Sequence, residues 1–108
     1  MTVEQLAKEC GFTVLHLADD AGEVRGAYAC DLLSWVIGRA EAGSALVTVM
    51  TNVNVIAVAV MAELPCVILS EGVIPDENAL QKAQMQGISV LSSNLPTYET
   101  CLAVGKAL

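Results

Sequence analysis

The side chains best suited to bind a ligand gather in three short polar clusters of the chain. They are Thr51-Asn52-Val53-Asn54, Ser70-Glu71-Gly72 and Ser92-Ser93-Asn94. Their hydroxyl and amide groups donate and accept hydrogen bonds, which suits the recognition of a base, a sugar or a small anion. The same residue types also serve as helix caps and turn residues in any α/β protein. Both interpretations stay open from the sequence alone.

Residues with catalytic chemistry are few and scattered. His16 is the only histidine and lies in a strand-like stretch, FTVLHL, while no glycine-rich loop continues into Lys-Ser or Lys-Thr to hold phosphates. Asp31 and Glu23 are conceivable paired carboxylates, although a helix cap and a surface charge are their more ordinary roles. We therefore expect no enzyme activity, no cofactor and no catalytic residue.

The cysteines are far apart in the chain and each has apolar neighbours. None of the four, Cys10, Cys30, Cys66 and Cys101, forms a pair with metal-ligand or redox-motif spacing. Free thiols buried in a reducing compartment are the expected state, so we expect no metal site. The first residues are too polar for a secretory signal peptide, and we expect a cytoplasmic protein.

The charge balance excludes two classes of partner. Five basic residues stand against twelve acidic ones, for a formal net charge of −7. Nucleic acids and anionic membrane surfaces both require a basic patch, and this composition supplies none. A phosphorylated ligand would have to be held mainly by backbone amides and helix N-termini.

The uncharged segment from Ala42 to Ala62 raises the question of a membrane span. Polar residues interrupt it near Asn52, and Pro65 follows soon after its end. Leu46–Met50 and Cys66–Leu69 read as buried strands, and the intervening residues are long enough for three helical turns. A strand, a helix and a second strand form a βαβ unit, whose strands are almost entirely apolar. We therefore expect the buried core of a globular domain and no membrane contact.

The remaining chain is expected to form further helices and strands. Helices are expected from a capping box at Thr2 to Gly11, from Asp31 through Val36, from Asp76 to Gly87, and from Pro96 to the C-terminus. Strands are expected at Phe12–Leu17, Glu23–Cys30 and Ile88–Leu91.

This alternation predicts a single α/β domain over residues 1–108, with a central, mainly parallel sheet and helices on both faces. The two N-terminal strands lie close together in the chain and could add a hairpin or an edge strand. Ligands of parallel sheets sit beyond the carboxyl ends of the strands, where the three polar clusters fall. The predicted ligand-binding rim consists of Thr51, Asn52, Asn54, Ser70, Gly72, Ser92 and Ser93.

The stretch from Val24 to Ser34, VRGAYACDLLS, resembles the signature of the DRTGG domain family. Two later pieces, Glu71–Asp76 and Gly87–Leu91 followed by PTYET, fit the same family in the same order. The motif residues are Arg25, Gly26, Tyr28, Asp31 and Ser34. Arg25 stands where the family has Thr, and Ala27 replaces its second Gly. Since alanine disfavours positive φ, we expect ordinary strand at that position.

The resemblance implies a non-catalytic regulatory module. It is similar to the regulatory region of long bacterial phosphotransacetylases and to the N-terminal domain of HPr kinase/phosphorylase, whose kinase chemistry lies in a separate P-loop domain. These relatives imply bacterial central or fermentative metabolism, with a nucleotide or a small anionic metabolite as ligand. The alternatives are a scaffold that binds only a protein partner and, less favoured, an enzyme related to serine kinases.

Self-association is a further expectation. A domain this small has little interior in which to hide Tyr28, Leu32, Leu33 and Trp35 together. The module that it resembles pairs within larger proteins, and two-fold dimers are the commonest assembly. We expect a homodimer, and the sequence leaves open whether Trp35 lies in the core or at the interface.

Overall fold

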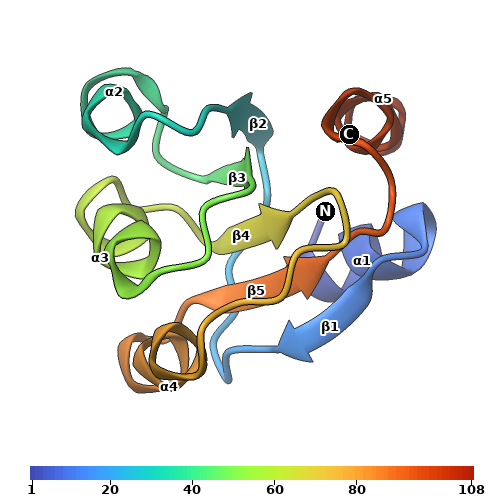
Figure 1. The fold of residues 1–108 in the computed structure, drawn as a ribbon. Helices are drawn as coiled ribbons and strands as arrows, with labels where there is room; N and C mark the ends of the chain where they lie inside the picture. The colour runs from blue at the N-terminus through green and yellow to red at the C-terminus, as the bar shows by residue number, and fades with distance from the viewer.

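The computed structural model describes residues 1–108 as three layers: helices, a five-stranded sheet, and helices again (Figure 1). The helices are α1 (Val3–Cys10), α2 (Leu33–Arg39), α3 (Val53–Met61), α4 (Glu77–Gln86) and α5 (Thr97–Ala107). The strands are β1 (Thr13–His16), β2 (Gly26–Ala29), β3 (Ser44–Thr48), β4 (Cys66–Leu69) and β5 (Ser89–Ser92). No helix is both long and apolar enough to cross a bilayer.

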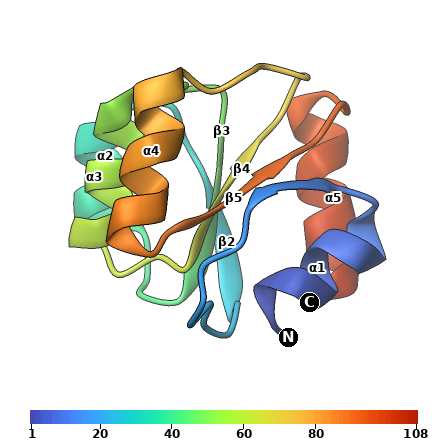
Figure 2. The same ribbon diagram turned by 90° about the horizontal axis from the view of Figure 1, so that it is seen from below.

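The strands lie in the order β1-β5-β4-β3-β2, and all neighbours are parallel except β1 and β5. This confirms the α/β prediction with a mainly parallel sheet. Of the two predicted arrangements for the first two strands, the hairpin is wrong and the edge strand is confirmed, because β1 and β2 occupy opposite edges of the sheet. The segment between them runs along the amino ends of the other strands, and its length makes this crossing possible (Figure 2).

Two apolar clusters fill the space on either side of the sheet. Helices α2, α3 and α4 cover one face with side chains such as Val36 and Ile56, while α1 and α5 cover the other with Leu6 and Val104 (Figures 1 and 2). The central strands β3 and β4 are buried along their whole length. The expected βαβ unit around the uncharged segment is therefore confirmed, with its first strand beginning at Ser44.

Of two helix caps predicted from the sequence, one is confirmed and one is wrong. The Thr2 hydroxyl accepts the Gln5 amide and the Gln5 side chain accepts the Thr2 amide, so the predicted capping box is confirmed. Asp31 does not cap α2: the residue at that position is Leu32, and no side chain caps the helix. The Asp31 carboxylate is directed instead at the end of β3, where it accepts two hydrogen bonds.

Candidate functional site

The carboxyl ends of β3, β4 and β5 meet at one rim of the sheet, as the parallel arrangement requires. Backbone hydrogen bonds tie the three following loops together. The Gly72 amide donates to the Ser93 carbonyl at 2.9 Å, and the Asp76 amide donates to the Thr51 carbonyl at 2.9 Å. The three polar clusters singled out in the sequence therefore belong to one connected surface.

Two of the predicted rim residues face inward. Ser70 and Ser93 are 0% and 2% exposed, and their hydroxyl oxygens lie 2.7 and 2.8 Å from those of Thr97 and Thr100. These contacts fasten the first turn of α5 to the ends of β4 and β5. Their hydrogen-bonding capacity is used within the fold, so their role here is structural.

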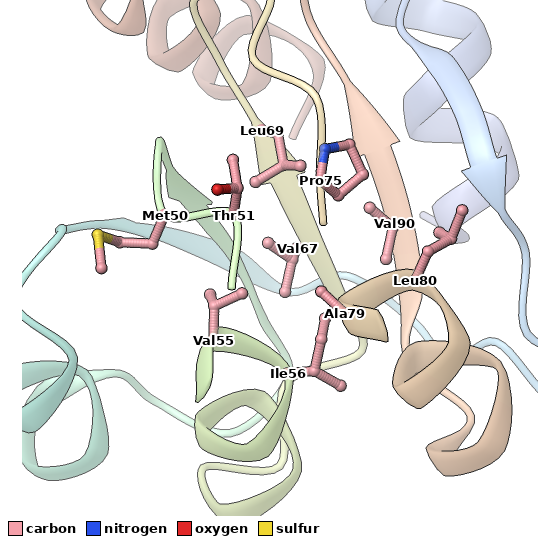
Figure 3. Close-up of a pocket in the computed structure, with 10 residues that line it drawn as sticks. All are labelled: Met50, Thr51, Val55, Ile56, Val67, Leu69, Pro75, Ala79, Leu80 and Val90. Carbon is pink, nitrogen blue, oxygen red and sulfur yellow. The ribbon is translucent and has the colours of Figure 1, made fainter. Parts of the chain in front are cut away.

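The polar groups that follow β3 also make contacts within the fold. The Asn52 side chain caps α3 by accepting the Asn54 amide at 2.9 Å, and Asn54 itself is exposed. Thr51 lines a cavity of about 10 Å³ whose other walls are mostly apolar (Figure 3). That volume is close to the minimum for one water molecule, so the cavity is a packing gap rather than a ligand site.

A larger hollow of about 380 Å³ opens on the other side of Pro75 and Leu80, which line both spaces. It lies between the loop that follows β4 and the strands β1 and β5. Its lining is mixed and carries no charged side chain: Leu15, Gly72, Val73, Ile74, Pro75, Leu80, Ser92 and Asn94. We call this hollow the rim groove. Of the predicted ligand-binding residues, only Gly72 and Ser92 lie in it.

The loop that forms one wall of the rim groove has an unusual backbone. Glu71 and Gly72 both adopt left-handed conformations, with φ of 62° and 68°. Glycine adopts this conformation freely, but glutamate does so only when its surroundings hold it there. The Glu71 carboxylate accepts the Thr97 amide at 2.6 Å and its own amide donates to the Leu95 carbonyl at 2.8 Å. Both bonds anchor the loop against the start of α5.

The motif residues between Arg25 and Ser34 lie far from the rim groove lining and do structural work. The Asp31 carboxylate accepts the Thr48 hydroxyl at 2.7 Å and the Val49 amide at 3.0 Å, which fixes the connection between β2 and α2. Ala27 pairs with Ala45 in regular parallel strand, as expected for an alanine in place of glycine. Gly26 and Tyr28 belong to the same strand, and Ser34 is exposed on α2.

The thiol, imidazole and acidic side chains are spread over the fold. No three histidine, cysteine or acidic side chains come together in a metal-binding arrangement. Burial raises the pKa of the Cys66 thiol to about 12, and burial together with the nearby Glu9 raises that of Cys10. High thiol pKa values mean little thiolate, the reactive form, at neutral pH. His16 has its buried Nε2 without a hydrogen-bond partner.

A comparison with known protein families shows to which family the chain is related. Residues 26–107 match the model of the DRTGG domain. The chain belongs to the DRTGG domain family. No curated protein matches this DRTGG domain in sequence.

A solved structure shares the fold over nearly the whole chain. It contains the CBS and DRTGG domains of the regulatory region of Clostridium perfringens pyrophosphatase, complexed with the activator diadenosine tetraphosphate. The TM-score is 0.75 at 11% identity, covering 99% of this chain and 47% of that chain. Because the family match begins at Gly26 and the structural match covers 99%, α1 and β1 belong to the same fold as the matched residues.

Sequence reasoning missed most of the rim groove. Leu15 comes from the antiparallel strand β1, and Ile74 comes from the loop after β4. Neither has a polar group that marks a site. Asn94 belongs to one of the polar clusters noted in the sequence, but only its position opposite Gly72 brings it to the rim groove. Its Oδ1 lies 3.5 Å from where a Cβ on Gly72 would stand.

Proposed function

We propose that this DRTGG domain is a non-catalytic regulatory module that binds a small ligand in the rim groove. The observation that carries the proposal is an open hollow at the carboxyl ends of parallel strands, with apolar walls and two polar side chains, Ser92 and Asn94. Ligand sites in such sheets occupy this position, and few polar groups in an apolar hollow are typical of them. The scattered catalytic residue types support a binding role over an enzymatic one.

A nucleotide or a related small anionic metabolite is the proposed ligand class. The wall formed by Leu15, Ile74 and Pro75 suits a flat ring, and the Ser92 hydroxyl and Asn94 amide suit its hydrogen-bonding edge. The structural neighbour was solved with diadenosine tetraphosphate, which supports this choice. Since the groove has no basic side chain and the chain carries a net charge of −7, we expect phosphates to remain at the solvent side and affinity for polyphosphates to be modest.

The wider setting is part of the same proposal. We place the module in the cytoplasm of a bacterium, in central or fermentative metabolism, as a homodimer whose ligand changes its contacts with a protein partner. Trp35 supports self-association, because its side chain is 46% exposed and thus lies outside the core. Large exposed aromatic side chains are enriched at interfaces.

The test is a thermal-shift screen of nucleotides, acyl phosphates and organic acids against the pure protein. A ligand that binds the native state raises the melting temperature by mass action. We expect a nucleotide to do so, and Asn94→Ala to abolish the shift. Asn52→Ala is the matched control: it removes a helix cap, lowering the melting temperature of the free protein, but leaves the ligand shift intact.

Each contrary outcome selects an alternative. A shift abolished by Asn52→Ala and kept by Asn94→Ala would place the ligand beside α3, where the sequence first suggested it. No shift with any compound would leave the protein-binding scaffold. Incubation with ATP, Mg²⁺ and candidate acceptor proteins tests the kinase-related alternative, and phosphate transfer abolished by a point mutation in this chain would overturn the non-catalytic proposal.

A further inference from the structure

Glu71 shapes the rim groove without lining it. Its φ is 62°, a conformation that a residue with a Cβ adopts about a tenth as often as an unstrained one. The wall of the groove begins at the next residue, Gly72, and continues through Ile74 to Pro75. Because a change of φ at Glu71 turns the chain that follows it, this wall keeps its observed position only while Glu71 is left-handed.

The start of α5 holds Glu71 in that conformation. The Glu71 carboxylate accepts the Thr97 amide at 2.6 Å. The first amides of a helix have no partner within it, and the residue at the N-cap of α5, Pro96, offers no side-chain acceptor. A carboxylate at a helix N-terminus is also favoured by the helix dipole. The groove wall and the first turn of α5 are therefore connected through one side chain.

A second glutamate shows that a left-handed conformation alone does not make this connection. Glu63 has a φ of 58°, but it follows the end of α3, where left-handed residues are common. Its amide donates to the Val60 carbonyl at 3.2 Å within the same turn. Glu63 precedes β4 and Glu71 follows it, so the two lie at opposite ends of the strand and only Glu71 stands beside the groove wall.

We propose that ligand binding in the rim groove and order in the first turn of α5 are linked through Glu71. The inference rests on the proposed function, because it needs a ligand in the groove. The ligand meets the complete wall only in the left-handed conformation, so it raises the population of that conformation and of the bond between Glu71 and Thr97. The linkage is reciprocal, so a partner that fixes the start of α5 raises ligand affinity. The effect of the ligand reaches the surface at this turn, where the Tyr98 side chain is 71% exposed.

Hydrogen exchange of single amides measures the linkage directly. The probe is adenosine monophosphate (AMP), a nucleotide with a single phosphate group. Saturating AMP should slow exchange of the Thr97 amide about tenfold, because it suppresses the conformation in which Glu71 has let go of that amide. The Leu6 amide of α1, which donates to the Thr2 carbonyl, is the internal control and should exchange at an unchanged rate. Amide NMR resolves both residues in one sample.

Three variants of equal charge separate the backbone conformation of Glu71 from its hydrogen bond. Glu71→Gln keeps an acceptor for the Thr97 amide and should bind AMP within about twofold of the wild type. Glu71→Ala loses the acceptor and still resists positive φ, so it should bind about tenfold more weakly. Glu71→Gly loses the acceptor but adopts positive φ freely, so it should regain most of that loss. Isothermal titration calorimetry measures the affinities, and a carboxylate that only stabilised the fold would make the alanine and glycine variants equal.

The other left-handed glutamate provides the matched control. Glu63→Ala and Glu63→Gly make the same changes outside the groove and should leave the AMP affinity unchanged. Wild-type affinity in Glu71→Ala, or unchanged Thr97 exchange at saturating AMP, would overturn the linkage while leaving a ligand in the groove. A wild-type protein that does not bind AMP would overturn the linkage together with the proposed nucleotide ligand.

Discussion

The two edges of the sheet have opposite properties. Strand β1 pairs antiparallel with β5, and its register shifts between Val14 and His16. Strand β2 pairs parallel with β3 in unbroken register. A bulge bends and twists a strand, which spoils it as a template for another strand, whereas a regular edge remains available. The difference teaches that the two edges of one sheet can differ in backbone regularity, since only β2 keeps an unbroken ladder beside its free side.

The chain is fastened to β5 just after the last residue of β1. The Ala18 amide donates to the Ser89 hydroxyl at 3.0 Å in a buried setting, which holds the chain at the start of β5. Asp19 and Asp20 follow and are exposed. No such turn or acidic pair guards β2, whose neighbours in sequence are Arg25 and Cys30.

The largest expected effect comes from removing the aromatic side chain beside the open edge. Trp35→Ala deletes an interface anchor from both copies at once, so we expect the dimer to dissociate about a hundredfold more readily. Because the ring is 46% exposed, the free energy of unfolding of the monomer should change by less than about 1 kcal/mol. Sedimentation equilibrium and urea unfolding below the dissociation constant measure the two. A monomer destabilised by several kcal/mol would instead place Trp35 in the core.

A second variant weakens the attachment of β1 to β5 without touching β2. Ser89→Ala leaves the buried Ala18 amide without its acceptor, which should reduce the free energy of unfolding by about 2 kcal/mol, or roughly thirtyfold in the folding equilibrium. The dimer affinity should not change. Urea denaturation of this variant beside Ser92→Ala, which changes a half-buried serine in the same strand, provides the control. If both variants lose the same free energy of unfolding, the hydrogen bond between the Ala18 amide and the Ser89 hydroxyl makes no specific contribution to stability.

Hydrogen exchange compares the two sides of β2 in the unmodified protein. The Ala27 and Ala29 amides face away from β3 and should exchange about tenfold faster than the Cys30 amide, which donates to the Val47 carbonyl. Amide NMR resolves the three residues in one sample. Equal exchange at all three would show that the outer side of β2 is covered.

The smallest effect concerns an ion pair near the start of the chain. The amino group of Met1 contacts the Glu23 carboxylate at 2.8 Å, but the Glu23 side chain is 59% exposed. Exposed pairs contribute little, so Glu23→Gln should change the folding equilibrium no more than about twofold and the dimer not at all. Thermal unfolding at low and high salt checks this. A salt-sensitive loss of several degrees would mean that the loop before β2 depends on this pair.

Sequence reasoning found the central strands but not the arrangement of the edges. The uncharged segment around β3, α3 and β4 was predictable because a strand buried on both faces is apolar throughout. The positions of β1 and β2 were not, because the two strands are adjacent in the chain and each is short. Only the long-range pairings of Val14 with Leu91 and of Tyr28 with Leu46 separate them.

The site was predictable in position more than in composition. Parallel strands bring their ends together, which correctly joined the loops containing Thr51, Gly72 and Ser92 into one surface. Which hydroxyls face solvent depends on the seating of α5, and this turned Ser70 and Ser93 inward. Asp31 showed the same limit: it precedes a helix as a cap would, yet the nearby end of β3 takes its carboxylate.

The two ends of the chain lie side by side on the face covered by α1 and α5 (Figures 1 and 2). The Met1 carbonyl accepts the Val24 amide at 2.8 Å, which keeps the first residue against the sheet. A unit with adjacent ends can be spliced into a surface loop of a host protein, since the host's loop need not be stretched and little closure entropy is lost. The fold is therefore suited to gene-level insertion: a host that acquires it gains an extra domain without opening its own core.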